Sequence, residues 1–147
     1  MSNPIVLDSG AYLAALLPNE PLALQAKNLL IWVEKNVFTL SAPVLLHYEV
    51  VAIARKSVYR QRISSENAEL VISSVLGRPI ALYVSLKLAQ RAYKLAETHN
   101  LPTAYDAQYL AVAEHLGCGF WTADEKLVNS VSAQLPWVKW IGGGLPS

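Results

Sequence analysis

Short apolar runs alternate with amphipathic segments along the whole chain, and this alternation restricts the fold more than any other feature. Each run holds four or five residues, which suits a buried strand and is short for a helix. The expected strands are residues 4–7, 37–40, 80–84, 119–122 and 137–141. A chain in which strands alternate with helices favours a parallel sheet with helices on both faces.

The segments between the strands are expected to be helices. The predicted helices cover residues 11–17, 21–35, 44–56, 65–76, 86–99, 104–116 and 124–131. Ser41-Ala42-Pro43 resembles a helix N-terminus with proline in the first turn. The 147 residues suit one domain, which we expect to span residues 1–147. Its core would cover residues 4–141, and the glycine-rich residues 142–147 would form a flexible tail.

Composition excludes several classes of protein. The chain is 53% hydrophobic and 16% charged, which is far too apolar for a disordered chain. The longest dense apolar run, residues 11–17, is much shorter than the roughly 20 residues of a membrane span. We therefore expect no membrane association. We also expect no secretory signal, because residues 1–8 contain no basic stretch and no long apolar run. The single cysteine, Cys118, cannot form an intramolecular disulfide, which favours a cytoplasmic location. The net charge of +1 means that nucleic-acid binding would need a local basic patch.

The acidic residues fall in a suggestive pattern. The only three aspartates, Asp8, Asp106 and Asp124, stand where a predicted strand ends or a predicted helix begins. Ligands of open parallel sheets bind beyond the carboxyl ends of the strands, so these side chains should meet at that edge. Glu49 lies on the apolar face of its predicted helix, where a carboxylate is costly unless it meets a cation or a strong donor.

Each acid also has a purely structural interpretation. Asp8 is a favoured helix N-cap residue. Residues 103–106 and 122–125 each fit a capping box. Glu49 has a candidate ion-pair partner in Arg55 or another basic residue across the core.

A shared cleft changes the chemistry expected of these carboxylates. Carboxylates that meet in one cleft repel one another and raise each other's pKa. A hard divalent cation relieves that repulsion, and ligands made of oxygen alone favour Mg²⁺ or Mn²⁺. Such an ion binds phosphate oxygens and activates water. The pattern therefore predicts metal-assisted hydrolysis of a phosphate ester.

Four segments, in this order and spacing, carry a family resemblance. They are IVLDS at residues 5–9, LHYEV at 46–50, AYDAQYLAVA at 104–113 and WTADEKL at 121–127. With them the chain resembles the PIN-domain family, and within it the VapC-type toxins of toxin–antitoxin pairs. The resemblance covers residues 5–141 and implies a PIN-like three-layer α/β fold, with a small, mostly parallel sheet flanked by helices.

The resemblance also implies an activity. The acidic quartet of the family maps onto Asp8, Glu49, Asp106 and Asp124, which would be both the metal ligands and the catalytic residues. The implied protein is an endoribonuclease that uses one or two Mg²⁺ or Mn²⁺ ions. Its implied partners are an RNA substrate, a cognate antitoxin and a second copy of the chain in a homodimer.

Two hydroxyl side chains near the quartet are further candidates. Ser9 and Thr122 are placed to contact metal-bound water or phosphate, and helix capping is the competing interpretation. Some family members carry another acid or asparagine shortly after the last aspartate, where this chain has Lys126 and Leu127.

A basic segment follows the helix that carries Glu49. Residues 55–62 contain four of the twelve basic residues of the chain. The predicted RNA-binding residues are Arg55, Lys56, Tyr59, Arg60 and Arg62. The basic side chains suit a phosphate backbone and the tyrosine suits base stacking, whereas a solvated helix end explains the same charges.

Other catalytic motifs are missing from the sequence. It contains no phosphate-binding G-x-x-x-x-G-K-[ST] loop, no G-x-S-x-G elbow and no zinc spacing of histidine or cysteine. Two alternatives to a toxin ribonuclease stay open. One is a catalytically silent PIN-like module that binds RNA or protein, and the other is a PIN nuclease of RNA processing.

Overall fold

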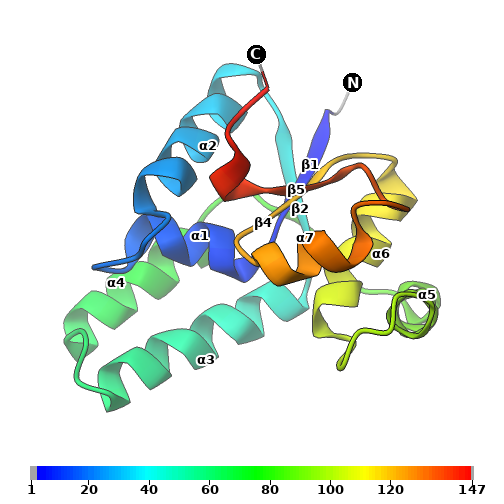
Figure 1. Ribbon diagram of the computed structural model, residues 1–147. Helices are drawn as coiled ribbons and strands as arrows, with labels where there is room; N and C mark the ends of the chain where they lie inside the picture. Colours follow the sequence, from blue (N-terminus) through cyan, green and yellow to red (C-terminus); the bar gives the residue numbers. More distant parts are fainter. Residues whose placement is uncertain (1–2, 147) are drawn as a thin grey trace.

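The computed structural model describes residues 3–146, and its core is one parallel sheet (Figure 1). The strands are β1 (Pro4–Leu7), β2 (Thr39–Pro43), β3 (Ala81–Tyr83), β4 (Phe120–Thr122) and β5 (Val138–Trp140). All four pairings between neighbouring strands are parallel. The predicted α/β class is confirmed. Residues 1, 2 and 147, which the predicted domain included, lie outside the described residues.

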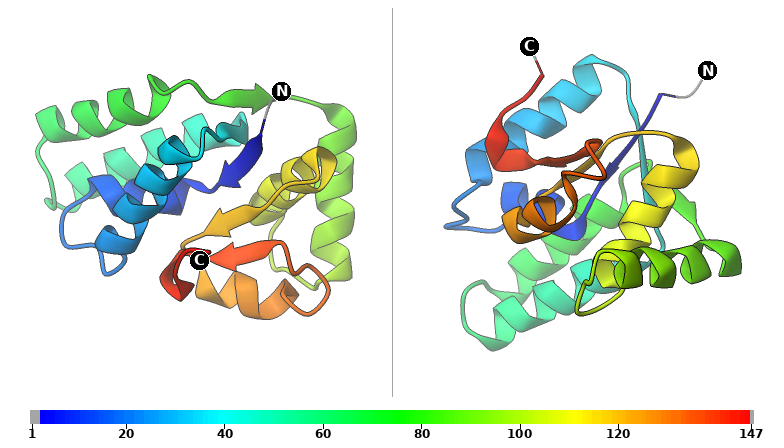
Figure 2. Two further views of the ribbon diagram at one scale, coloured as in Figure 1. Left: turned by 90° about the horizontal axis from the view of Figure 1, so that it is seen from above. Right: turned by 45° about the vertical axis from the view of Figure 1, so that its right-hand side comes forward.

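Helices cover both faces of the sheet, which gives three layers. They are α1 (Ser9–Leu16), α2 (Ala23–Lys35), α3 (Leu45–Tyr59), α4 (Ser65–Leu76), α5 (Leu86–Thr98), α6 (Tyr105–Leu116) and α7 (Glu125–Val131). Figure 2 shows α1 to α4 on one side of the strands and α5 with α6 on the other. None of the described helices is both long enough and apolar enough to cross a membrane.

The order of the strands creates a crevice at one edge of the sheet. The order is β3-β2-β1-β4-β5, so the chain builds outward from β1 to β3 and then returns to place β4 on the other side of β1. Neighbouring strands whose connections leave in opposite directions open a crevice beyond their carboxyl ends. In this chain the crevice lies beyond the ends of β1 and β4.

Helix α6 closes the core against this part of the sheet. It packs on β1, β2 and β4. All residues from 107 to 113 are buried except Gln108, which is half-buried. The helix ends at Gly117, whose φ of 63° is a left-handed conformation that glycine adopts without a steric penalty. This firm packing fixes the side chains that α6 presents to the crevice.

The predicted boundaries of β2 were wrong at both ends. Val37 is exposed and has a φ of 55°, so it belongs to the turn after α2 rather than to a strand. Ser41, Ala42 and Pro43, predicted to begin a helix, instead pair with β3. Proline is tolerated at the end of the strand, where the backbone N–H of Val44 supplies the next bond, donating to the Tyr83 carbonyl (3.2 Å).

The segment predicted as a flexible tail starts with ordered structure. Ile141–Gly143 form a turn of 3₁₀ helix, η1, which packs against α2. A Cβ atom on Gly142 would overlap the indole ring of Trp140. Gly142 therefore lets the backbone approach that ring closely, which the sequence pattern did not indicate.

Candidate active site

Four elements bring the predicted acidic quartet to the crevice. Asp8 follows β1 directly, and Asp124 stands two residues after β4. Glu49 projects from α3, and Asp106 is the second residue of α6. Asp106 is close enough to Asp8, Glu49 and Asp124 for the charges to interact. The structure thus gathers all four side chains, which we call the acid cluster.

Asp8 is the most buried member of the acid cluster. Its Oδ1 accepts a hydrogen bond from the backbone N–H of Ala11 (2.8 Å) and so caps α1. Its Oδ2 accepts from the Thr122 hydroxyl (2.5 Å). Burial raises the pKa of Asp8 to about 6, although these two hydrogen bonds act in the opposite direction. The structural and functional interpretations of Asp8 are therefore compatible.

Thr122 connects the two loops that carry Asp8 and Asp124. Its hydroxyl donates to Asp8 and accepts from the backbone N–H of Asp124 (3.0 Å). Asp124 Oδ1 in turn accepts from the backbone N–H of Leu127 (3.2 Å) and caps α7. The capping pair predicted within residues 122–125 was wrong, because Asp124 is the cap and Thr122 bridges to the neighbouring strand.

Glu49 is held by hydroxyl groups rather than by a cation. Its Oε1 accepts hydrogen bonds from Tyr109 (2.5 Å) and from Ser9 (3.3 Å). Arg55, the predicted ion-pair partner, instead lies over the ring of Tyr59, with its Cζ 5.8 Å from the centroid. The predicted ion pair was wrong. The Ser9 hydroxyl thus contacts a carboxylate, that of Glu49, and does not cap a helix.

Asp106 has no structural task in the helix that carries it. Helix α6 begins after Ala104, which makes no side-chain capping bond, so the capping box predicted over residues 103–106 was wrong. Burial raises the pKa of Asp106, and the charges of Asp124 and Glu49 raise it further. A half-buried carboxylate beside two others is energetically unfavourable without a cation, which makes Asp106 a candidate functional residue.

The donor chemistry of the acid cluster fits a hard divalent cation. Four carboxylates and the hydroxyls of Ser9 and Thr122 provide oxygen ligands alone, as Mg²⁺ and Mn²⁺ prefer. As the side chains lie in residues 3–146, no three of the histidine, cysteine, aspartate or glutamate groups converge closely enough to enclose an ion. Mg²⁺ usually keeps several waters, so these oxygens would hold it largely through water.

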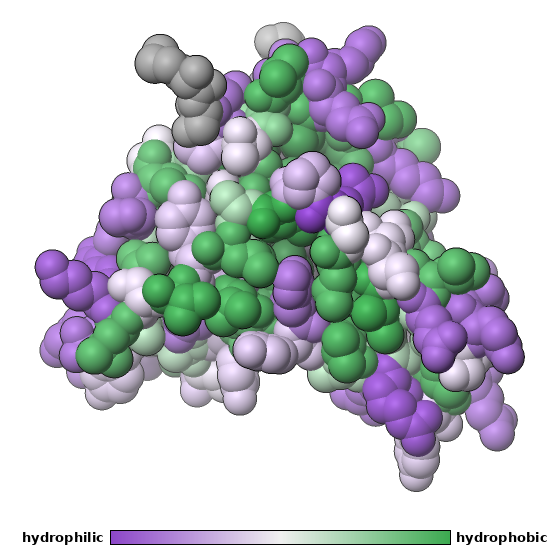
Figure 3. Space-filling view, turned by 180° about the vertical axis from the view of Figure 1, so that it is seen from behind, coloured by the Kyte–Doolittle hydropathy of each residue, from purple (hydrophilic) through white to green (hydrophobic). Residues whose placement is uncertain are grey.

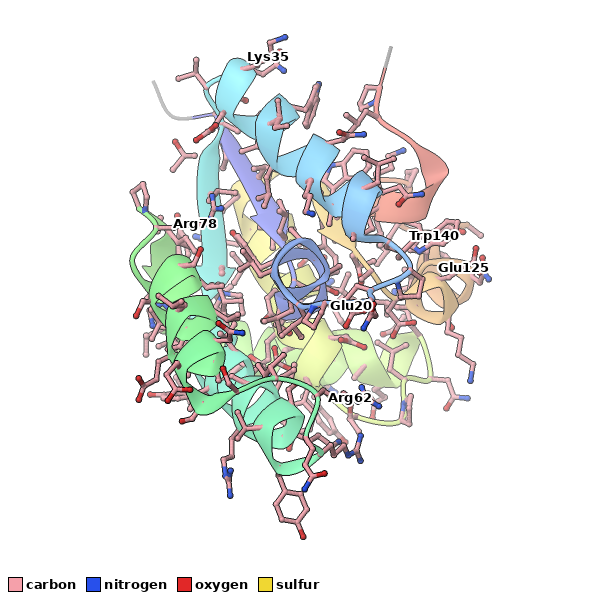
Figure 4. All side chains as sticks on the ribbon, turned by 90° about the vertical axis from the view of Figure 1, so that its left-hand side faces the viewer. Glu20, Lys35, Arg62, Arg78, Glu125 and Trp140 are labelled. Atoms are coloured by element: carbon pink, nitrogen blue, oxygen red, sulfur yellow. The ribbon has the colours of Figure 1, made fainter. Side chains whose placement is uncertain are left out.

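A groove runs along α1 and α3 beside the acid cluster: Gly10, Ala123 and Glu125 line it, and none of the four acids does. Three adjoining cavities of about 520, 250 and 840 Å³ form it, and we call it the α1–α3 groove. Glu125 and Trp140 line the first cavity, Glu20 lines the first two and Arg62 lines the last two. Figure 4 shows these four side chains on the same side of the molecule. The groove is acidic near the cluster and basic at its far end.

The predicted RNA-binding residues divide between the groove and its surroundings. Lys56, Arg60 and Arg62 line the basic end, whereas Arg55 and Tyr59 pack on each other. All five are exposed. Arg60, the C-cap residue of α3, stands eleven positions after Glu49, which is about 16 Å along the helix axis at 1.5 Å per residue. The basic end is thus clearly separate from the acid cluster.

Tyr109 is the residue that sequence reasoning missed. It lies three positions after Asp106, on the same face of α6, and its hydroxyl reaches Glu49. In an apolar helix, tyrosine is typical of the core, and the ring of Tyr109 is indeed stacked on Phe120. The usable signal was that a buried tyrosine hydroxyl usually finds a polar partner.

The sequence also matches a known family. The family model of the PIN domain matches residues 5–130. The chain belongs to the PIN domain family. Among its curated relatives, Ribonuclease VapC12 of Mycobacterium tuberculosis is 33% identical over 126 residues, which are 86% of this chain and 91% of that protein. The resemblance to VapC-type members is thereby confirmed.

Solved structures share the architecture. PAE2754 from Pyrobaculum aerophilum superposes with a TM-score of 0.69 at 22% identity, covering 97% of this chain and 94% of that one. VapBC2 from Rickettsia felis, bound to a DNA fragment from its promoter, gives a TM-score of 0.63 at 15% identity, covering 93% and 96%. At these identities the likeness concerns the fold, and the predicted PIN-like fold class is confirmed.

The raised pKa of Asp8 predicts how stability depends on pH. The folded state binds this proton more tightly than the unfolded state, so its stabilising effect is full below pH 3.8 and is lost as pH rises through 6. Without divalent cations, wild-type stability should fall by about 2 kcal/mol between pH 4 and pH 7.5 relative to Asp8→Asn.

Urea unfolding of both proteins in EDTA measures this difference. Asparagine retains the capping acceptor, so the variant keeps the helix start and removes the titration. Parallel pH profiles for the two proteins would show that Asp8 is already ionised at little cost in the fold.

Proposed function

We propose that this chain is a VapC-type endoribonuclease, the toxin of a toxin–antitoxin pair, and that it hydrolyses RNA phosphodiester bonds with Mg²⁺ or Mn²⁺. The observation that carries the proposal is the acid cluster itself, in which Asp106 lies beside other carboxylates and caps no helix. Relatives named ribonucleases, matched over most of the chain, support the same activity.

The residues of the site would have different roles in this reaction. Asp8, Asp106 and Asp124 would hold one or two ions, directly or through water, and Glu49 would complete the shell or orient the attacking water. A bound ion supplies stabilisation of charge on the phosphate oxygens and a more acidic water. Thr122 keeps the loops of Asp8 and Asp124 in register through its two hydrogen bonds. No histidine or lysine base is needed in this scheme.

Cleavage of a mixed RNA pool tests the activity directly. Wild-type protein should cleave with Mg²⁺ or Mn²⁺ and stop in EDTA, and Asp8→Asn should reduce the rate at least about 100-fold while the helix cap is kept. Glu34→Gln, which neutralises an exposed acid on α2, is the matched control and should cleave like wild type.

Two results would contradict the ribonuclease proposal. Full activity of Asp8→Asn would show that cleavage does not depend on the acid cluster. A folded chain that binds Mn²⁺ but cleaves no RNA in a broad substrate panel would favour the catalytically silent module instead.

We further propose that RNA runs from the acid cluster to the basic end of the α1–α3 groove. Lys56, Arg60 and Arg62 give this end the positive charge that a phosphate backbone requires. Since the proposed substrate is RNA and Cys118 is an unpaired thiol, we propose a cytoplasmic location.

Removal of two of these charges tests the RNA path. Arg60→Ala combined with Arg62→Ala should weaken RNA binding and lower the slope of log K against log salt by about 1.4, at roughly 0.7 per phosphate contact. Binding is measured by fluorescence anisotropy at several salt concentrations. Lys35→Ala combined with Lys139→Ala removes the same charge outside the groove and should leave the slope unchanged. Equal slopes in both double variants would argue against this path.

We propose that the antitoxin covers the same groove. Its floor between the charged ends is apolar, with Leu13, Leu17 and Ile53 among its lining residues. A partner seated there would cover the approach to the acid cluster and the basic end together.

A second apolar surface lies on another face of the molecule: Figure 3 shows apolar side chains over the middle of the rear face. A homodimer is a further proposal, tested by sedimentation velocity of the isolated chain.

A charge in the groove floor tests the partner proposal. The chain is coexpressed with the product of a short reading frame adjacent to its gene, and the complex is captured by a tag on that product. Ile53→Glu should reduce capture at least about tenfold, because it buries a charge in the apolar contact. Ile31→Glu, on the exposed face of α2, should not. Undiminished capture of Ile53→Glu would place the partner elsewhere.

A further inference from the structure

Tyr109 makes a short contact to the acid cluster from within the core. Its side chain is 1% exposed, and its hydroxyl donates to Glu49 Oε1 at 2.5 Å. Ser9 donates to the same oxygen at 3.3 Å. Two hydroxyls, from α1 and α6, therefore converge on one oxygen of a carboxylate carried by α3.

Packing fixes the place of the Tyr109 hydroxyl. The ring lies parallel to that of Phe120, with an interplanar angle of 8° and centroids 5.8 Å apart. Phe120 begins β4 and is fully buried. A tyrosine ring has only two side-chain torsions, so a ring held on one face by a strand leaves its hydroxyl little freedom.

The contact leaves the other oxygen of Glu49 available. Among residues 3–146 we find protein donors on Oε1 and none on Oε2. A carboxylate tied at one oxygen has a defined orientation and one free oxygen for a cation or its water. In metal sites, hydrogen bonds to a ligating carboxylate orient it and affect metal affinity.

We propose that Tyr109 is a positioning residue, which holds Oε1 of Glu49 and leaves Oε2 free for the cation expected in the acid cluster. This inference rests on the proposed function, because it takes the cluster to be a divalent-cation site. Tyr109 itself touches neither substrate nor cation. It acts through Glu49, and Ser9 assists it.

A second buried tyrosine provides a matched control. Tyr12, on α1, is as buried as Tyr109, yet its hydroxyl has no partner among the described residues. Its hydroxyl therefore makes no hydrogen bond to the acid cluster among the described residues. Tyr12→Phe is the matched control for Tyr109→Phe.

The affinity for Mn²⁺, measured by electron paramagnetic resonance without RNA, tests the proposal. Tyr109→Phe keeps the ring and removes one hydroxyl, and it should weaken Mn²⁺ binding about tenfold or more. Tyr12→Phe removes a hydroxyl that has no partner, and it should bind Mn²⁺ like wild type. Thermal unfolding of both variants checks that the fold is kept. If Tyr109→Phe fails to fold, Ser9→Ala replaces it, with an expected weakening of severalfold.

A double-mutant cycle separates positioning from general damage. Glu49→Gln should weaken Mn²⁺ binding by itself, and Tyr109→Phe added to it should change the affinity less than about twofold. Equal effects of Tyr109→Phe with Glu49 and with glutamine at that position would overturn the proposal. So would wild-type affinity in Tyr109→Phe.

The assay also distinguishes this proposal from the ribonuclease proposal. If Tyr109→Phe weakens Mn²⁺ binding and the wild type cleaves no RNA, positioning stands and the ribonuclease proposal fails. If the wild type cleaves RNA and Tyr109→Phe binds Mn²⁺ normally, only positioning fails. A wild-type chain that binds no Mn²⁺ would overturn both.

Discussion

The parallel pairing of β1 with β4 is the constraint on which the site depends. These strands are neighbours in the sheet although more than 100 residues separate them in the chain. Their pairing places Asp8 and Thr122 side by side, and one hydrogen bond then joins the two loops beyond the strands. The other acids are added from helices that pack on this central pair: α3 brings Glu49, and α6 brings Asp106. A change that shifted β4 by one residue would turn Thr122 away from Asp8 and separate the loops.

Burial and charge act against each other in this arrangement. The core that fixes the acid cluster also removes water from it, and desolvation is the largest cause of the raised pKa of both Asp8 and Asp106. Hydroxyl donors offset part of that cost, from Thr122 to Asp8 and from Ser9 and Tyr109 to Glu49. Asp106 lies beside the other carboxylates but accepts no hydrogen bond from a hydroxyl among the described residues. A divalent cation would relieve the remaining electrostatic cost of these carboxylates. The repulsion that destabilises the chain without metal therefore favours metal binding.

The sequence was most informative where one residue property decides a structure. Apolar runs predicted all five strands, and the placement of three aspartates predicted their common edge, because both follow from local pattern and parallel topology. It was least informative where a distant contact decides. Pro43 resembled a helix start and was a strand end, because the pairing with β3 outweighed its local preference. The pairing of β1 with β4 and the contact of Tyr109 with Glu49 join residues 60 or more positions apart, which periodicity does not record.

Helix capping gives the members of the acid cluster unequal freedom to change in evolution. Asp8 and Asp124 each accept a backbone N–H at the start of a helix, so a descendant that abandoned catalysis would still need a short acceptor side chain at both positions. Asp106 carries no such obligation. In a lineage that drifted toward a binding role, position 106 should therefore diverge first, while positions 8 and 124 would keep a short acceptor side chain for folding alone. Among descendants of this chain, retained caps would be a poor record of retained activity, and Asp106 a better one.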